Sequence, residues 1–335
     1  MKKLVLFFCI LALGLLVACG SNSEGNGEAE GEGTQELRLA HNLSEDHPIH
    51  TALTSFAEAV EDKTNGTITF EIFSNGVLGS ESEVLEQLQN GSVDITKVSA
   101  GALETFSDEY SVFSLPYIFT SDEHYRNVME SEIVQEIYQS TEANDFIGLS
   151  YFDSGARSFY TKDTPIETPE DLEGMLIRVM DSRTAIEMVR LLGGTPTPLA
   201  YGEIYTALQQ GVIDGAESNP TALTTGQHGE VSKAFSYSEH TNIPDIVVIN
   251  KGKWESFTDN QRQAFLDAAD ESRVEHTELW NQALEEAVKD AEEMGVQFYE
   301  VNKEPFIEAV QPLHEEYSQD ERLAEIIDAI NELNQ

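Results

Sequence analysis

The chain has 335 residues, with 19 Lys+Arg against 61 Asp+Glu and a formal charge of −42. This length suits two domains of ordinary size or one large domain, and the 40% share of hydrophobic residues is enough to fill a core. The charge argues against a nucleic-acid binder, because neutralising phosphates needs a basic face, but a few buried cations can still attract a small anion locally.

The first eighteen residues have the pattern of an export signal. Two lysines precede an apolar run, residues 4–17, which is shorter than a membrane-spanning helix usually is. The run ends in LVAC (residues 16–19), which resembles a bacterial lipobox and implies cleavage before Cys19 and a lipid on its sulfur. The alternatives are an ordinary secretory signal cut near Ala18 or an uncleaved anchor. Because both lysines leave with the signal, the charge of the remaining chain falls from −42 to −44.

Cysteine usage agrees with this organisation. The chain has two cysteines, Cys9 inside the signal and Cys19 at its end, so the remaining chain has no possible disulfide and no thiolate metal site. Residues 19–35 are rich in Gly, Glu and Ser and lack an apolar period, which predicts a flexible acidic tether. The folded body is then expected over residues 36–335.

The first part of the body alternates between two periods. Residues 36–41, 67–73 and 93–98 have the pattern of strands, and residues 48–63 and 81–89 have the period of helices. This β-α-β-α-β order predicts an α/β fold with a largely parallel sheet and helices on its faces. Ligands of such sheets bind beyond the carboxyl ends of the strands.

The pattern restarts in the second part of the body. We expect helices at residues 123–139, 182–192 and 202–210, strands at 146–152, 157–160, 175–179 and 246–249, and one long helix or two abutting ones at 258–293. Two such halves predict two lobes with a ligand cleft between them. Lobe I would span about residues 36–152 with part of the C-terminal region, and lobe II about residues 153–245.

Sequence signatures of enzymes are mostly absent. We find no Walker-type phosphate loop, HExxH or GxSxG, and we expect no cofactor. His41, His47 and His50 lie close together, but their spacing straddles a strand, a loop and a helix start. We therefore favour roles at a cleft rim or a helix cap over a metal site.

Two arginines stand in settings that a surface charge would not choose. Arg157 follows an apolar strand, and Arg178 lies inside the apolar segment 175–179. A buried guanidinium is costly unless it is paired with an anion, and its planar fork grips a carboxylate with two hydrogen bonds. The anion is either a ligand or one of the abundant Asp and Glu side chains of the protein.

Three ordered blocks make the chain recognisable. TPEDLEGMLIRV (168–179), LGGTPTP (192–198) and GEIYTALQQGVIDGAE (202–217) resemble the solute-binding proteins of tripartite ATP-independent periplasmic (TRAP) transporters, over residues 37–311. The resemblance implies a two-lobed periplasmic-binding-protein-like fold with a long helix spanning both lobes, an organic anion in the cleft, and a membrane permease as partner.

The resemblance also implies ligand-binding residues. Arg178 matches the arginine that pairs with the substrate carboxylate, Arg157 one that usually faces the ligand, and Tyr201 an aromatic residue that stacks near it. The family commonly supplies an Asn after D-G-x-E, where this chain has Ser218 followed by Asn219, so the resemblance leaves open which one serves. The remaining candidates are Asn42, Glu81, Ser99 and His240.

A carboxylate held by two arginines fits several anions. Glu81 would repel a second carboxylate but accept hydrogen bonds from sugar hydroxyls, so we expect a hexuronate or related sugar acid. A C4-dicarboxylate is the second candidate and an ectoine-like zwitterion the third. An anchored enzyme acting on sugar acids and a purely structural lipoprotein are the other classes. We expect a monomer, lipid-anchored outside the cytoplasm, without nucleic-acid partners.

Overall fold

The computed structural model describes residues 34–334. The predicted signal, the lipidation candidate Cys19 and nearly all of the predicted tether lie outside the described residues. The first strand begins at Gln35, the last residue assigned to the tether.

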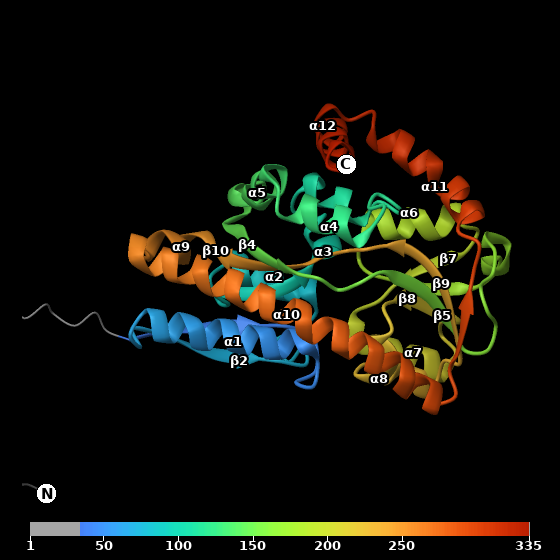
Figure 1. Ribbon diagram of the computed structural model, residues 1–335, viewed down its shortest axis with the longest axis horizontal. Helices are drawn as coiled ribbons and strands as arrows, with labels where there is room; N and C mark the ends of the chain where they lie inside the picture. The colour runs from blue at the N-terminus through green and yellow to red at the C-terminus, as the bar shows by residue number, and fades with distance from the viewer. Residues whose placement is uncertain (1–33, 335) are drawn as a thin grey trace, which may run out of the picture. The chain divides into compact units, whose positions relative to one another are not determined.

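Two sheets form the centres of two lobes (Figure 1). The sheet of the first lobe has the order β2-β1-β3-β10-β4, and that of the second has the order β11-β9-β5-β8-β6-β7. The first sheet contains β1 (Gln35–Ala40), β2 (Ile68–Phe73), β3 (Ile95–Ser99), β4 (Phe146–Phe152) and β10 (Asp245–Asn250). The second contains β5 (Arg157–Thr161), β6 (Leu176–Val179), β7 (Thr195–Pro198), β8 (Gly215–Ser218), β9 (Ala234–Thr241) and β11 (Gln297–Glu300).

Each sheet is parallel except for one strand. β10 runs antiparallel to β3 and β4, and β5 runs antiparallel to β8 and β9. Both exceptions follow a crossing between the lobes, β4 to β5 through residues 153–156 and β9 to β10 through residues 242–244. A link this short cannot carry the chain to the far end of the other sheet, so the next strand begins at the near end and runs opposite to its neighbours.

The helices cover these sheets. In chain order they are α1 (Pro48–Lys63), α2 (Glu81–Gln89), α3 (Ala100–Leu103), α4 (Asp122–Met129), α5 (Glu132–Gln139), α6 (Arg183–Leu191), α7 (Ile204–Gln210), α8 (Thr221–Thr224), α9 (Lys251–Ser256), α10 (Asp259–Glu293), α11 (Glu304–Tyr317) and α12 (Glu321–Glu332). The single helix predicted for residues 123–139 is two helices, because the chain adopts an extended conformation at Ser131.

The long helix α10 runs from one lobe to the other (Figure 1). It packs on α1 and β4 in the first lobe and on α8 in the second. From the sequence we expected Leu266 and Val274 on the apolar side of this helix, but both are exposed. Alanines, together with Ser272, His276 and Trp280, make up much of its buried face, so the helix approaches its neighbours closely.

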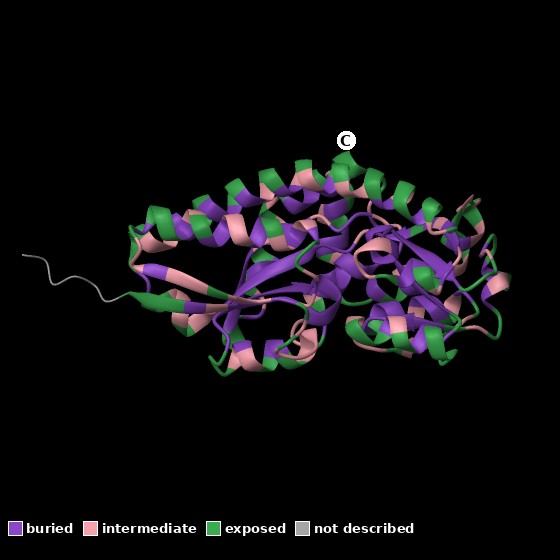
Figure 2. Ribbon diagram, turned by 90° about the horizontal axis from the view of Figure 1, so that it is seen from below, coloured by how far each residue is buried: buried purple, intermediate pink, exposed green. Residues whose placement is uncertain are grey.

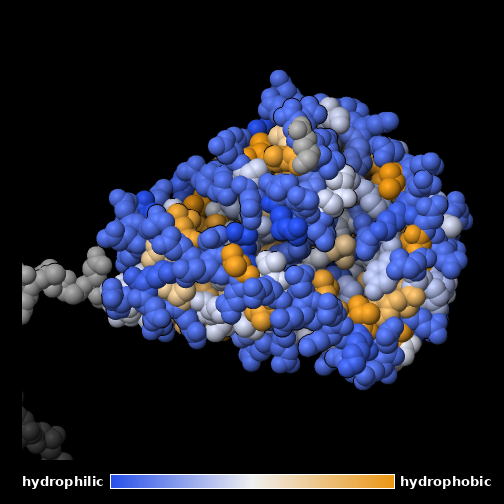
Figure 3. Space-filling model, in the orientation of Figure 1, coloured by the Kyte–Doolittle hydropathy of each residue, from blue (hydrophilic) through white to orange (hydrophobic). Residues whose placement is uncertain are grey.

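The strands are largely buried and the helices turn their polar faces outward (Figure 2). One apolar cluster in the first lobe joins α1, β1 and β10 to α10, and another in the second lobe joins β5 and β9 to α7. The face shown in Figure 3 is mostly hydrophilic with separate apolar spots, which agrees with the excess of acidic residues. These packed layers hold the strand ends that carry the site.

Candidate functional site

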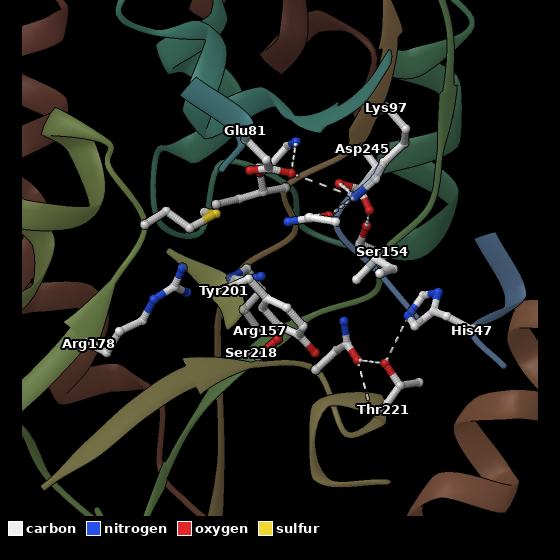
Figure 4. Close-up of a pocket in the computed structure, with 16 residues that line it drawn as sticks. His47, Glu81, Lys97, Ser154, Arg157, Arg178, Tyr201, Ser218, Thr221 and Asp245 are labelled. Carbon is white, nitrogen blue, oxygen red and sulfur yellow. Dashed lines mark hydrogen bonds and ion pairs between the residues drawn. The ribbon is translucent and has the colours of Figure 1, made fainter. Parts of the chain in front are cut away.

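A polar cavity lies where the ends of the two sheets face each other (Figure 4). The first lobe lines it with Asn42, Glu81, Lys97, Ser99 and Asp245, and the second lobe with Arg157, Arg178, Tyr201, Ser218 and Asn219. The cavity has a volume of about 60 Å³. Five of its lining residues also line a groove of about 700 Å³ that leads outward between the lobes.

Eight of the nine candidate residues from the sequence line this cavity. The ninth, His240, does not. Its ring is fully buried, stacks on Phe159 at 4.4 Å between centroids, and places Nε2 3.6 Å from Glu217. His240 therefore lies on the far side of the Arg157–Glu217 pair from the cavity.

Arg178 projects from β6, and no carboxylate of the described residues pairs with its guanidinium. The residue is 4% exposed, and its Nε donates to the Leu199 carbonyl at 2.9 Å. Among residues 34–334, no carboxylate lies within 4.0 Å of it. Burial lowers the pKa of Arg178, with the Glu217 charge acting in the opposite direction, yet a guanidinium stays protonated in proteins. A buried cation in this state favours binding of an external anion.

Arg157 is neutralised by the protein itself. Its Nε donates to Glu217 Oε2 at 2.6 Å, and its Nη2 donates to Oε1 at 2.9 Å and to the Glu217 carbonyl at 2.7 Å. Burial alone would raise the pKa of Glu217, but Arg157 and His240 lower it to about 2. The internal salt bridge that the sequence left open therefore exists for Arg157 and not for Arg178.

Lys97 is a buried cation that the sequence reasoning missed. It is 2% exposed on β3, and its Nζ lies 3.1 Å from Asp245, 3.2 Å from the Asn42 side-chain oxygen and 3.7 Å from Glu81. A signal was available, because the alternation of the strand places Lys97 on the same face as Val93 and Ile95, and a cation among apolar residues is also what singled out Arg178.

The two carboxylates beside Lys97 differ in environment. Burial raises the pKa of Glu81, with Lys97 opposing, and its Oε1 accepts a hydrogen bond from the Ser99 backbone N–H at 3.0 Å. Burial would also raise the pKa of Asp245, but Lys97 and a 2.6 Å hydrogen bond from Ser154 outweigh it and lower that pKa.

The charges make the cavity electrically asymmetric. With both carboxylates ionised, Lys97 and its two partners leave one net negative charge at the first-lobe end. The pair of Arg157 with Glu217, together with Arg178, leaves one net positive charge at the second-lobe end. A ligand with a carboxylate at one end and hydrogen-bond donors at the other complements this field.

Tyr201 opens the short 3-10 helix Tyr201–Glu203 and borders both the cavity and the groove. Its ring lies 5.5 Å from the ring of His228, and burial raises its pKa to about 12 against the influence of Arg178. The hydroxyl is therefore neutral at neutral pH and offers both a donor and an acceptor next to the arginine.

The three histidines that lie close together in the sequence do not form one cluster in the structure. His41 Nε2 lies 3.0 Å from His50 Nδ1, whereas His47 caps α1. Within residues 34–334, no group of three or more His, Cys, Asp or Glu side chains has the arrangement of a metal site. The same part of the chain has no helix that is long and apolar enough to cross a membrane.

Residues 39–320 match the family model DctP, bacterial extracellular solute-binding protein, family 7. The chain belongs to this family. The DctP family consists of solute-binding proteins rather than enzymes. Membership in this family confirms the resemblance and the two-lobed α/β fold inferred from the sequence.

Relatives of this DctP protein cover most of its length. An uncharacterised protein of Salmonella typhimurium, YiiZ, is 46% identical over 285 residues, which are 83% of this chain and 86% of the relative. A TRAP periplasmic solute-binding protein from Anaerococcus prevotii with bound D-glucuronate is 40% identical, with a TM-score of 0.88 over 90% of this chain and 98% of that one. One from Xanthobacter autotrophicus with bound β-D-galacturonate is 35% identical, with a TM-score of 0.85 over 88% and 98%.

Proposed function

We propose that this protein captures a hexuronate, such as glucuronate or galacturonate, outside the cytoplasm and delivers it to a TRAP permease. One observation carries the proposal: Arg178 is a buried cation whose guanidinium end faces the cavity without a protein carboxylate among the described residues. The similar proteins with bound glucuronate and galacturonate support the choice of a sugar acid.

In this proposal the ligand carboxylate lies against Arg178. Arg157 is held rigidly by Glu217 and offers Nη1, the one nitrogen of its guanidinium not used in those hydrogen bonds. Tyr201 stacks beside the sugar ring. The hydroxyls point toward Asn42, Glu81, Ser99, Ser218 and Asn219, and the carboxylate of Glu81 accepts from them.

The first-lobe end argues against a second carboxylate on the ligand. A dicarboxylate would gain Lys97 but would meet both Glu81 and Asp245, which already neutralise it. A ligand carboxylate placed beside these two carboxylates in a buried site would cost several kcal/mol, whereas a ligand hydroxyl would donate hydrogen bonds to the same oxygens. This makes a C4-dicarboxylate the second candidate and an ectoine-like zwitterion the third.

The cavity alone is small for a monosaccharide. Its volume is about 60 Å³, whereas the groove beside it has about 700 Å³. A monosaccharide must therefore occupy the cavity together with part of the groove, or widen the cavity. We infer that the links at residues 153–156 and 242–244 act as the hinge, and that bound ligand shifts the lobes toward closure.

The test is a pair of arginine substitutions read by calorimetry with D-glucuronate and D-galacturonate. Arg178→Ala should weaken binding by at least about 100-fold, because the carboxylate loses its charged, hydrogen-bonding partner in a dry site. Arg183→Ala is the matched control, because Arg183 is largely exposed five residues along the chain. Unchanged affinity in Arg178→Ala, or no binding of any sugar acid to the native protein, would overturn the proposal.

We also propose that Cys19 carries a lipid that anchors the protein to the outer face of the cell membrane. The LVAC motif supports this, and the acidic tether would let the body reach a permease. In cells, the native protein should partition into the detergent-rich phase of a phase-separation assay and Cys19→Ser into the aqueous phase. Equal partitioning of the two would contradict the anchor.

A further inference from the structure

His47 has a fixed proton position. It precedes α1 as its N-cap, and its Nδ1 accepts from the Ile49 backbone N–H at 3.2 Å. The residue is 4% exposed, and burial, aided by the charge of Lys97, lowers the pKa of His47 to about 3. A neutral imidazole that accepts on Nδ1 carries its proton on Nε2, so this ring donates from Nε2.

The Nε2 atom of His47 points across the cleft to Thr221 (Figure 4). It lies 3.4 Å from the Thr221 hydroxyl. That hydroxyl is 2.6 Å from the Asn219 side-chain oxygen, and the Thr221 backbone N–H donates to the same oxygen at 2.9 Å. The chain of donors therefore runs from His47 through Thr221 to Asn219.

These hydrogen bonds fix the orientation of the Asn219 amide. Its oxygen already accepts two hydrogen bonds from Thr221, so the amide cannot turn over without losing both. Within the described residues its Nδ2 makes no hydrogen bond, and Asn219 lines the cavity. Asn219 thus offers a ligand donors and no acceptor.

We propose that His47 is a positioning residue that orients the Asn219 amide through Thr221 and links the two lobes around the ligand. The inference rests on the proposed function, because the oriented amide donates to a ring or hydroxyl oxygen of the sugar acid. His47 and Thr221 belong to different lobes: His47 lies between β1 and α1, and Thr221 begins α8 after β8. The contact joins the two lobes as they stand in this structure, so it favours that arrangement.

Two substitutions at His47 separate this role from helix capping. His47→Asn keeps a capping side chain but is too short to reach Thr221, whereas His47→Gln reaches Thr221 with its amide N–H and is a poorer cap. We expect His47→Asn to weaken D-glucuronate binding about tenfold with little loss of melting temperature. His47→Gln should keep the affinity within about threefold and lose some melting temperature. A purely structural role predicts the reverse order, which would overturn the proposal.

Thr221 supplies the second pair of variants. Thr221→Val removes the hydroxyl at nearly constant shape and should weaken binding about tenfold, because the Asn219 amide loses one of the two hydrogen bonds that orient it. Thr221→Ser should restore most of the affinity. If His47, Thr221 and Asn219 act as one hydrogen-bonded unit, the double variant His47→Asn/Thr221→Val should lose no more affinity than either single variant. Additive losses of affinity would contradict this.

Nitrogen-15 NMR of the imidazole gives a signature that ligand affinity does not. His47 should show the neutral tautomer protonated on Nε2 at neutral pH, and the Nδ1-protonated form would overturn the inference. The outcomes are distinct from failure of the proposed function. Strong glucuronate binding with no effect of Thr221→Val would contradict only this inference, whereas the absence of any sugar-acid binding would contradict the proposed function.

Discussion

Burial divides the cations of this protein into two groups. Most lie at the surface in pairs with exposed carboxylates, such as Arg190 with Glu187. Lys97, Arg157 and Arg178 are instead buried at the cavity. These three differ in how far protein carboxylates neutralise them: Lys97 has two, Arg157 has one, and Arg178 has none within the described part of the chain. The residue with the least compensation is the one that we expect to dominate ligand binding.

The Arg157–Glu217 pair gives a prediction about stability. Glu217→Gln leaves a buried guanidinium without its anion, so the free energy of unfolding should fall by about 3–5 kcal/mol in urea titration. Glu187→Gln removes an exposed pair and should change it by less than about 1 kcal/mol. The folded pKa of Glu217, about 2, lies below the ordinary 4.5. Its contribution is therefore complete above pH 4.5, and the difference between native protein and Glu217→Gln should shrink as the pH falls toward 2.

Among the elements, the short strand β8 does most to assemble the site. It lies between β5 and β6, carries Glu217 and Ser218, and leads directly to Asn219. Its first residue, Gly215, packs so closely on β5 that an added Cβ would lie 2.6 Å from the Tyr160 carbonyl oxygen. From the sequence we interpreted Asp214-Gly215 only as a turn, whereas in the structure the glycine permits the close pairing of two strands.

Gly215→Ala should therefore disturb both packing and binding. A methyl group against a backbone carbonyl forces β8 away from β5, so we expect a loss of about 1–3 kcal/mol in unfolding free energy and weaker glucuronate binding. Gly202→Ala is the control for stability, because an added Cβ there meets nothing within 4 Å. Equal melting temperatures for the two variants would show that the strands can separate without strain.

For the molecule as a whole, acid sensitivity should come first from buried histidines rather than from its many carboxylates. Burial lowers the pKa of His41, His47 and His228 from 6.5 to about 3. Between these values the unfolded chain binds protons that the folded chain does not, so stability is complete above pH 6.5 and is lost as the pH falls. Each histidine contributes about 1.4 kcal/mol per pH unit.

The melting temperature should accordingly fall between about pH 7 and pH 5, a range in which few carboxylates titrate. His228→Gln removes one such group and should flatten the profile. This residue lies beside the Tyr160 hydroxyl at 2.7 Å, which a glutamine can still contact. A melting temperature that stays constant or rises toward pH 5 would show that relief of negative-charge repulsion outweighs the histidines.

The sequence by itself determined the local elements and the residues worth attention. The bounds of α1 and α2 match the predicted ones, because the helical period runs the length of each segment and an Asn, Asn65 or Asn90, follows its end. Arg157 and Arg178 stood out for an equally local reason, a charge in or beside an apolar strand. Lys97 carried the same signal and was overlooked.

Only the tertiary structure decided which carboxylate neutralises which cation. Arg157 and Glu217 are 60 residues apart in the chain, and Lys97 and Asp245 are 148 apart. With 61 acidic residues available, no sequence pattern selects these partners. The strand order of the two sheets does so, because it brings β8 beside β5 and β10 beside β3. Within the described residues it brings no carboxylate to Arg178, which is why we propose this residue for the ligand.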